Sequence, residues 1–482
     1  MLPARLSRKL AHLSLNLVPI PIIGIVAYYI FQEDVLSHIR VSAARLLIEV
    51  RRILGCCPPP KFFINSSNHR QWMTRKLEQS GWQEGTPADS TFIWHLEKRI
   101  LPKVFSPVFN GLPNLLLLDD KAVLALITRR FTRTRPLVTH ILYGEWDDAR
   151  VSALRERWAD PACNEPQWWI IKDAHASNGF SAAIFDRSVR PIVKKDVPGG
   201  YCYVVQEYVE RPLLIDGRKF ELRQYVLIRG DGSAYTYNRA LIRLACVPYN
   251  PSSKDPRVHI TNKYVQTGWE SCSSEGRVLE DIELVSRDWP PYASLLDSEI
   301  TPLIADLADA IVPLVSVSPT SRDNGKSGLT DQTDRSGHFE LFACDLVVTE
   351  SGKVHLMEIN INCAFGKFHP RTQKGLIRPL FEDLMSLCVL PAARNVRAAP
   401  GGWCRVRCGN GALQPETSVA TKELQEHQMY VAFKKSSKKK YERQFVSQEF
   451  VLSDLARDET PKEEGKCVTC GYFTCVCHRR AC

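Results

Sequence analysis

Residues 339–362, FELFACDLVVTESGKVHLMEININ, constrain the fold more than any other segment of the chain. Two runs of β-forming residues flank a Ser–Gly dipeptide, which predicts a β-hairpin with a two-residue turn closed by Glu350 and Lys353. This register places Asp345 directly opposite Glu358. The Cβ atoms of such a pair are about 5 Å apart, so two carboxylates there need a cation or a shared proton between them.

The neighbouring amide completes a candidate metal site. Asn360 lies two residues after Glu358 and is therefore expected on the same face of the strand. Two carboxylates and an amide oxygen suit Mg²⁺, which keeps its other positions for water and nucleotide phosphate. The alternative is a surface hairpin with solvated acids, but the apolar residues that alternate with the acids favour burial.

A second strand, RKFELRQYVLI over residues 218–228, carries alternating charges. Because side chains alternate between the two faces of a strand, Lys219, Glu221 and Arg223 are expected on one face and the apolar residues between them on the other. Burying such charges costs free energy unless they meet ligands or each other. The strand is thus the wall of an anion-binding pocket or a salt-bridged structural ladder.

Further segments carry residues suited to a nucleotide. Lys172 ends the predicted strand WWIIK and precedes DAHASNG, a loop of small residues that could hold phosphates, although a solvated lysine is the simpler alternative. Backbone groups near Gln206 to Val209, at the end of another predicted strand, could meet a purine. Arg243 lies in the predicted strand YTYNRALIRLA, and HITN, residues 259–262, follows a proline-rich connector.

Length, charge and cysteine usage set the wider limits. A chain of 482 residues predicts about two or three lobes that share a large core. The formal net charge of +10 indicates either an acidic partner or simply a soluble basic surface. Cysteines within the folded middle stand singly, which favours reduced thiols and a cytosolic setting.

The two ends of the chain differ from the middle. Residues 10–31 are apolar and long enough to cross a bilayer, so they form either a membrane anchor or an uninserted leader. The run 434–443 is basic, which is typical of a solvated disordered segment or of a docking patch. A zinc knuckle, acylation or free thiols are the alternatives for Cys467, Cys470, Cys475 and Cys477.

Taken together and in this order, the segments resemble the tubulin–tyrosine ligase family. The similarity runs from about Phe62 to Leu390 and is closest over QEYVERPLLIDGRKFELRQYVLI, YNRALIRLACVPYN, HITNKYVQ and FELFACDLVV…HLMEIN. The resemblance implies an α/β (α+β) fold of the ATP-grasp type, with nucleotide between a central and a C-terminal lobe. The expected divisions are a leader at 1–60, an N-terminal α/β lobe at 61–150, a central lobe at 151–250, a C-terminal lobe at 251–395 with a mobile loop at 316–337, and a basic, Cys-rich, largely disordered tail at 396–482.

The resemblance also implies the reaction, which is that of an ATP-dependent carboxylate–amine ligase with Mg²⁺. Free tyrosine would be joined to the C-terminal carboxylate of α-tubulin, in its acidic tail, through an acyl phosphate. Addition of glutamate or glycine, and non-catalytic binding of tubulin or nucleotide, stay open. A cytoplasmic, cytoskeleton-associated protein with no nucleic-acid partner is expected, tethered to a membrane if residues 10–31 insert.

Residue by residue, the resemblance assigns four sets of roles. ATP contacts are implied for Lys172, Gly179, Gln206, Glu207, Tyr208, Val209 and Lys219. Magnesium ligation is implied for Asp345, Glu358 and Asn360, and catalytic roles for Arg223, Arg243 and Glu358. Substrate contacts are implied for Glu221, Thr261 and Asn262. Two departures leave weakened catalysis open: Asn178 and Ser181 replace a basic residue and a second glycine in the phosphate loop, and Glu221 replaces an aspartate.

Overall fold

The structure of the protein is a computed structural model that describes residues 58–66, 70–95, 106–112, 118–143, 148–160, 162–174, 182–187, 202–253, 255–262, 265–266, 282–316, 336–361, 363, 365, 368–392 and 397–409. Within these ranges, no helix has both the length and the apolar character needed to cross a membrane. Several predicted features lie outside the described residues: the apolar segment 10–31, Gly179, residues 317–335 of the predicted loop, the basic run 434–443 and the C-terminal cysteines.

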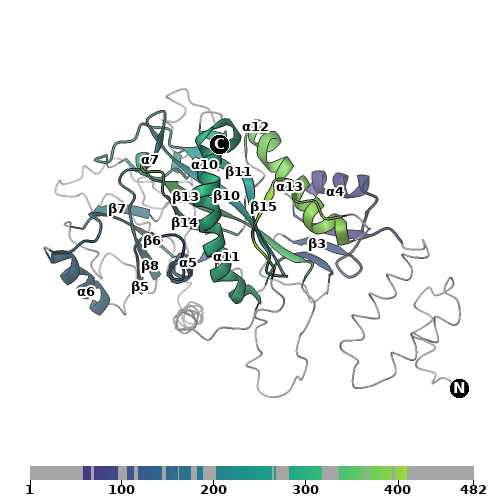
Figure 1. Ribbon diagram of the computed structural model, residues 1–482, viewed down its shortest axis with the longest axis horizontal. Coiled ribbons are helices and arrows are strands. Elements are labelled where there is room, and N and C mark those ends of the chain that lie inside the picture. Colours follow the sequence, from purple (N-terminus) through teal and green to yellow (C-terminus); the bar gives the residue numbers. More distant parts are fainter. Residues whose placement is uncertain are drawn as a thin grey trace, which may run out of the picture.

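A mixed sheet of 11 strands forms the centre of the described part of the chain (Figure 1). Its main path runs β12-β11-β10-β13-β4-β3-β1-β2, while β14, β15 and β9 pair with β13, β11 and β10. The strands are β1 (Lys61–Asn65), β2 (Gln83–Glu84), β3 (Phe92–His95), β4 (Val108–Asn110), β9 (Leu214–Ile215), β10 (Arg218–Arg229), β11 (Ala234–Leu244), β12 (Glu283–Val285), β13 (His338–Val348), β14 (Val354–Asn360) and β15 (Trp403–Arg407).

Helices cover both faces of this sheet, and each face has its own apolar core. On one face α11 packs its apolar side against β10 and β13, with Leu307 and Leu346 fully buried in the same cluster. On the other face α13 packs against Tyr225 and Leu341. The helices of the large sheet are α4 (Arg70–Gln79), α5 (Lys121–Thr128), α7 (Pro256–His259), α10 (Pro291–Leu295), α11 (Thr301–Ser316), α12 (Pro370–Thr372) and α13 (Arg378–Leu384), with π-helical turns at Leu296–Ile300, Gln373–Ile377 and Met385–Val389 and 3-10 turns at Ser286–Asp288 and Leu390–Ala392.

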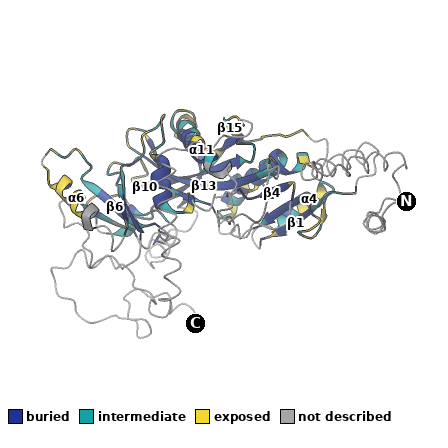
Figure 2. Cartoon of the chain, turned by 90° about the horizontal axis from the view of Figure 1, so that it is seen from below, coloured by how far each residue is buried: buried dark blue, intermediate teal, exposed yellow. Residues whose placement is uncertain are grey.

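A separate antiparallel sheet of four strands, in the order β5-β8-β6-β7, lies beside the large one (Figure 1). Trp158, Trp169 and Phe185 form its core with Val205. In Figure 2 the strands of both sheets are largely buried, whereas α6 is mostly exposed at the outer edge of the small sheet. The elements are β5 (Thr139–Tyr143), α6 (Asp148–Ala159), β6 (Trp168–Asp173), β7 (Ala182–Asp186) and β8 (Cys202–Glu207).

Each sheet combines strands from both sides of a predicted lobe boundary. β5 precedes residue 150 but belongs to the small sheet, while β10 and β11 precede residue 250 but belong to the large one. Within the predicted tail at 396–482, β15 pairs with β11 and Trp403 is buried. Long-range strand pairing, which local sequence patterns do not encode, sets these divisions.

Strand β10 confirms the predicted alternation of charged and apolar side chains. It lies between β11 and β13 in the sheet and is antiparallel to both. Phe220 and Leu222 pack into the core beneath α11, so Lys219, Glu221 and Arg223 face the other side. The turn before the strand uses positive φ angles at Asp216 and Gly217, 51° and 70°, as a type I′ turn requires.

The hairpin of β13 and β14 pairs Asp345 with Glu358, as predicted, but it reaches this register by a different route. The turn has three residues rather than two, since the N–H of Thr349 donates to the carbonyl of Lys353 at 2.8 Å. A β-bulge at Met357, between the pairs Asp345–Glu358 and Leu346–Leu356, then restores the predicted pairing.

The buried residues of β14 independently locate this bulge. Val354 and Leu356 before it, and Ile359 and Ile361 after it, all pack into the same core cluster. Even-numbered and odd-numbered residues of one strand share a face only where an extra residue interrupts the alternation. Glu358 consequently faces away from that core.

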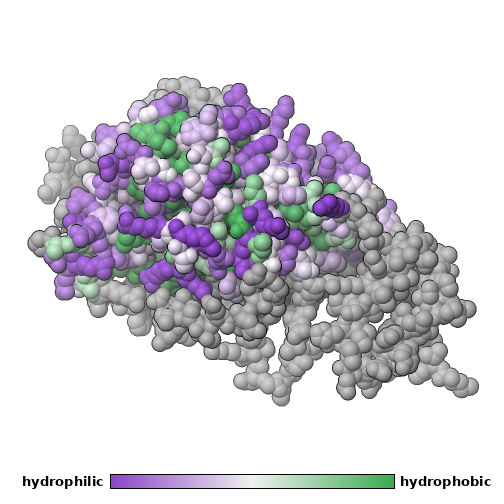
Figure 3. Space-filling view, viewed as in Figure 1, coloured by the Kyte–Doolittle hydropathy of each residue, from purple (hydrophilic) through white to green (hydrophobic). Residues whose placement is uncertain are grey.

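The outer surface is mainly polar. Figure 3 shows hydrophilic side chains over most of the described face seen in Figure 1, with small hydrophobic areas between them. Among the described residues, Leu214 is the one large hydrophobic side chain that counts as exposed, at 37%. The surface therefore gives less indication of function than the cleft between the sheets.

Candidate functional site

A cleft of about 890 Å³, counting its mouth open to solvent, lies between the small sheet and the charged end of the large sheet. It gathers predicted residues from six segments of the sequence: Lys172, Gln206, Glu207, Tyr208, Val209, Lys219, Glu221, Arg243, Thr261, Asn262, Asp345 and Glu358. Arg223 and Asn360 reach this cleft through their contacts with Asp345. Gly179 lies outside the described residues.

Asp345 is the centre of a buried polar cluster. Arg223 binds it with two hydrogen bonds, from Nε to Oδ1 and from Nη2 to Oδ2, each 2.8 Å long. Arg243 Nη2 donates to the same Oδ2 at 2.8 Å, and Asn360 Nδ2 donates to it at 2.9 Å. Arg243 also forms an ion pair with Glu221 on the adjacent strand.

The charges of this cluster balance one another. Burial alone would raise the pKa of Asp345, but the guanidinium groups of Arg223 and Arg243 outweigh it and lower the pKa to about 2. Burial raises the pKa of Glu221, and Arg243 opposes that shift. Asp345 therefore stays ionised at neutral pH and fixes both arginines at the floor of the cleft.

The oxygen atoms of Asp345, Glu358 and Asn360 fit a magnesium ion by their chemistry. Asp345 Oδ1 accepts a hydrogen bond from Arg223 alone among the described residues, which leaves that oxygen with a lone pair. The Glu358 side chain is 33% exposed and lies 3.6 Å from Lys121 Nζ. The described ranges contain no group of three or more His, Cys, Asp or Glu that could hold a metal, and the predicted set instead combines two carboxylates with an amide.

Two lysines line the same cleft as Asp345 and Glu358. Lys172 on β6 donates to Gln206 Oε1 at 2.9 Å, while Lys219 on β10 donates to the hydroxyl of Tyr208 at 3.2 Å. Burial lowers the pKa of Lys172 to about 8 and that of Lys219 to about 7. Both ammonium groups thus donate to neutral acceptors, and buried cations held in this way favour an anion such as a phosphate.

The sequence model of the tubulin-tyrosine ligase family matches residues 108–397, which is more than half of the chain and includes every described residue of the cleft. The chain belongs to this family. The mixed α/β arrangement agrees with the ATP-grasp-type fold predicted from the resemblance. The family resemblance inferred from the ordered motifs is thereby confirmed.

Relatives of this family differ in the reaction that their names record. A probable tubulin–tyrosine ligase of Saccharomyces cerevisiae is 26% identical over 299 residues, 52% of this chain and 37% of that protein. A tubulin monoglycylase of Homo sapiens is 28% identical over 206 residues, 40% of this chain and 25% of that protein. A probable tubulin polyglutamylase of Mus musculus is 26% identical over 284 residues, 57% and 46% of the two chains. The chain thus spans less than half the length of each of these family members.

Lys121 is a cleft residue of this family member that the sequence patterns did not identify. It is the first residue of α5, whose N-cap Asp120 accepts hydrogen bonds from the backbone N–H groups of Ala122 and Val123. Its side chain approaches Glu358 and lines the same cleft as Lys172. The signal was present, since Asp120 precedes an apolar run, but only the fold shows that this helix begins beside the site.

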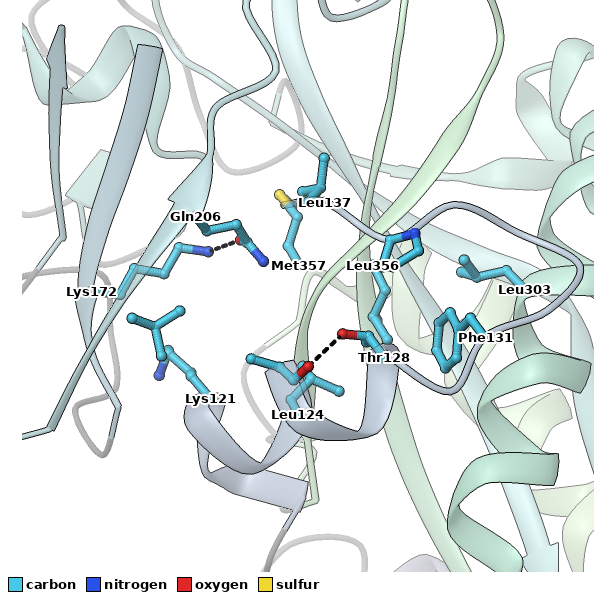
Figure 4. Close-up of a pocket in the computed structure, with 13 residues that line it drawn as sticks. Lys121, Leu124, Thr128, Phe131, Leu137, Lys172, Gln206, Leu303, Leu356 and Met357 are labelled. Carbon is cyan, nitrogen blue, oxygen red and sulfur yellow. Dashed lines mark hydrogen bonds between the residues drawn. The ribbon is translucent and has the colours of Figure 1, made fainter. Parts of the chain in front are cut away.

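A small cavity adjoins the cleft behind Lys172 and Gln206 (Figure 4). Lys121, Leu124 and Thr128 enter it from α5, and Met357 enters it from the bulge of β14. Since Met357 also lines the main cleft, the bulge presents two consecutive residues, Met357 and Glu358, to the same side. Apolar side chains form most of the lining of this cavity, so it contributes few polar groups to the site.

Proposed function

We propose that this protein is an ATP-dependent ligase that joins an amino acid to a carboxylate of tubulin. One observation carries the proposal: Asp345 and Glu358 are paired across β13 and β14 and face the same cleft as Lys172 and Lys219. This arrangement combines hard oxygen ligands with buried cations, which is what a magnesium–nucleotide complex requires.

The two lysines would hold the phosphates from opposite sides of the cleft. Lys172 belongs to the small sheet and Lys219 to the large one, so a polyphosphate between them would contact both sheets. Gln206 to Val209 would line the adenine. A magnesium ion, bound by Asp345, Glu358 and Asn360, would neutralise negative charge on the phosphates.

The arginines would act on the reacting carboxylate. Arg223 and Arg243 are fixed by Asp345, so their remaining N–H groups need no reorganisation when charge develops. Arg243 Nε is buried and has no hydrogen-bond partner among the described residues, which leaves a donor for a substrate oxygen. Glu221, with Thr261 and Asn262, would bind the incoming amino acid.

In this reaction a carboxylate oxygen attacks the γ-phosphorus of ATP and ADP leaves. The amino group then attacks the acyl carbon, inorganic phosphate leaves, the amine loses a proton and an amide forms. Both steps are transfers between bound substrates, so no nucleophilic side chain of the enzyme is needed. Positioning and charge stabilisation by the cleft would supply the catalysis.

Tyrosine, added to the C-terminus of α-tubulin, is the amino acid that we propose first. The stretches RPLLIDGRKFELR and VPYN support this choice because they resemble the tyrosine-adding type. The names of the glycylase and polyglutamylase relatives support glycine or glutamate as the second candidate. A non-catalytic tubulin-binding role is the third, since Asn178 and Ser181 alter the phosphate loop.

Labelled tyrosine, glutamate and glycine, each incubated with purified protein, ATP and detyrosinated tubulin, separate these candidates. Incorporation of one amino acid by the wild-type protein, and of none by Glu358→Gln, is the expected result. Incorporation of none by the wild-type protein, with ATP still bound, would favour the non-catalytic role. Full activity of Glu358→Gln would overturn the assignment of Glu358 to magnesium.

Location in the cell also follows from this proposal. A tubulin-modifying ligase would be cytoplasmic and associated with the cytoskeleton, and insertion of residues 10–31 would tether it to a membrane. Flotation of the full-length protein with lipid vesicles, compared with a variant lacking residues 1–55, tests the tether. Equal flotation of the two proteins would exclude it.

A further inference from the structure

A chain of hydrogen bonds connects Lys219 to a histidine outside the predicted site residues. Lys219 Nζ lies 3.2 Å from Tyr208 Oη, and Tyr208 Oη lies 2.8 Å from His259 Nδ1. His259 Nε2 in turn lies 2.7 Å from the backbone carbonyl of Ser253. Lys219, Tyr208 and His259 are all buried, at 6%, 7% and 8% exposure, so water competes little for these contacts.

The direction of each hydrogen bond follows from the last acceptor in this series, the backbone carbonyl of Ser253. A backbone carbonyl can only accept, so His259 must carry its proton on Nε2 and donate it to Ser253. Burial lowers the pKa of His259, which keeps the ring neutral and leaves Nδ1 as an acceptor. Tyr208 therefore donates its hydroxyl proton to His259, and its oxygen lone pairs remain to accept from Lys219.

Tyr208 holds the ammonium group of Lys219 in a second way as well. Lys219 Nζ lies 4.5 Å from the centroid of the Tyr208 ring, within the range of a cation–π interaction. Both contacts favour the charged form of the lysine. Burial opposes them, because it lowers the pKa of Lys219 to about 7.

The same histidine belongs to the segment that reaches the other half of the cleft. His259 ends α7, whose N-cap Asp255 accepts from the N–H of Arg257, and the next residues along the chain include Thr261 and Asn262. Those two residues line the cleft beside Glu221. The bond from Tyr208 to His259 thus fastens this segment to the end of β8.

We propose that Tyr208 and His259 are positioning residues: their directed hydrogen bonds hold Lys219 toward the phosphate subsite and tie that subsite to the segment carrying Thr261 and Asn262. This inference rests on the proposed function, because it assumes that Lys219 meets a nucleotide phosphate. The two residues act through Lys219 and need not touch the phosphate themselves. Tyr208, His259 and Lys219 therefore work as one unit.

The test compares the affinity of the full chain for ATP and for adenosine, which lacks phosphates. Tyr208→Phe removes the acceptor hydroxyl but keeps the ring, and His259→Leu removes the acceptor of the tyrosine proton. Each variant should bind ATP about tenfold more weakly, the effect of one hydrogen bond to a charged group. Adenosine binding should be far less affected, because the backbone of residues 206–209 is proposed to line the adenine and neither substitution alters that backbone. The double variant should lose no more than either single variant.

Two further variants separate positioning from loss of folding. His259→Asn places an amide oxygen near the position of Nδ1 and should restore ATP affinity to within about twofold of wild type. Tyr237→Phe is the matched control, because the Tyr237 hydroxyl on β11 donates to Asp383 Oδ2 at 2.9 Å and makes no contact with Lys219, Tyr208 or His259. It should leave ATP affinity unchanged.

A pH profile of ATP binding gives a readout that a purely structural role would not change. The charged or titratable groups that face Lys219 are Glu221 on its own strand, Lys172 from β6, and Tyr208 and His259. Loss of the Tyr208 hydroxyl removes an acceptor that favours the ammonium form, so Lys219 loses its proton at lower pH. In Tyr208→Phe the alkaline loss of ATP affinity should therefore shift to lower pH.

The outcomes distinguish this inference from the proposed function. If wild-type protein binds ATP, but Tyr208→Phe and His259→Leu bind it within twofold of wild type, the positioning role is wrong and the proposed function stands. Equal losses for ATP and adenosine would also overturn it, since they would indicate general damage to the cleft. If the wild-type protein binds adenosine no more weakly than ATP, the phosphate subsite itself is wrong and the proposed function falls with it.

Discussion

Replacing Asp345 by asparagine should destabilise the fold, whereas replacing Glu358 by glutamine should not, although both substitutions should abolish ligation. Asp345 is 7% exposed at its side chain and neutralises two arginines whose side chains are 9% and 11% exposed. Removing one partner of a buried ion pair leaves uncompensated charge and costs about 3–5 kcal/mol. Asparagine keeps the shape and an acceptor oxygen, so we expect a loss of about 3 kcal/mol in the free energy of unfolding.

The pKa of Asp345 supports this magnitude and fixes its pH dependence. A carboxyl pKa lowered from 3.8 to about 2 in the folded state corresponds to roughly 2 kcal/mol of stabilisation at neutral pH. Because the folded-state pKa is the lower one, this stabilisation is complete above 3.8 and is lost as the pH falls through about 2. Asp345→Asn should lack that part of the acid dependence.

Glu358 differs because its environment is less buried. Its side chain is 33% exposed and its contact with Lys121 spans 3.6 Å, so Glu358→Gln should cost less than about 1 kcal/mol. Urea denaturation, followed by tryptophan fluorescence in the presence of a chelator, measures both values. The reasoning fails if Asp345→Asn unfolds within about 0.5 kcal/mol of wild type, or if the two variants are equally destabilised.

Three other predictions concern Lys121 in the cleft and the buried Asp306 of α11. Lys121→Met should weaken ATP binding about tenfold without unfolding the protein, because the variant removes a cation beside Glu358. An isothermal titration that finds unchanged affinity would argue against Lys121 in the site. Asp306→Asn should lower the free energy of unfolding by about 2 kcal/mol. The reason is that this carboxylate, 2% exposed, accepts hydrogen bonds from the backbone N–H groups of Thr132, Arg133 and Thr134. A urea midpoint equal to that of wild type would contradict this. Burial raises the pKa of Asp306, but hydrogen bonds, first among them one from Thr134, lower it overall. The difference in the free energy of unfolding between wild type and Asp306→Asn should therefore shrink as the pH falls below 3.8. A difference that stays constant between pH 7 and pH 3 would refute the assignment.

The local patterns of two strands were sufficient to predict how the charged residues of the candidate site are arranged on their strands. Side chains along β10 alternate between the two faces of the sheet, and this period of two residues is enough to place Lys219, Glu221 and Arg223 on one face. The pairing of Asp345 with Glu358 was also correct, but the assumed two-residue turn was not. The bulge at Met357 offsets the extra turn residue, and no rule of turn chemistry could have located it.

Contacts between distant segments were beyond what such patterns specify. The pairing of β13 with β4, through His338 and Phe109, joins the early strands to the site-bearing sheet. Lys121 enters the cleft only because α5 packs against both β8 and β14. His259 was identified as part of HITN, but its contact with Tyr208 depends on where α7 comes to lie. Such placements follow from packing of the whole domain rather than from any one segment.

The division of the cleft between two sheets has a thermodynamic consequence. Lys172 and Gln206 belong to a sheet whose strands pair only with each other among the described residues, while Asp345 and Glu358 belong to the other sheet. A molecule bound across the boundary contributes its binding free energy to the contact between the two bodies. Saturating nucleotide should thus protect the backbone amides of β6 and β8, which belong to a four-stranded sheet with a small core, from hydrogen exchange far more than those of β10 in the 11-stranded sheet.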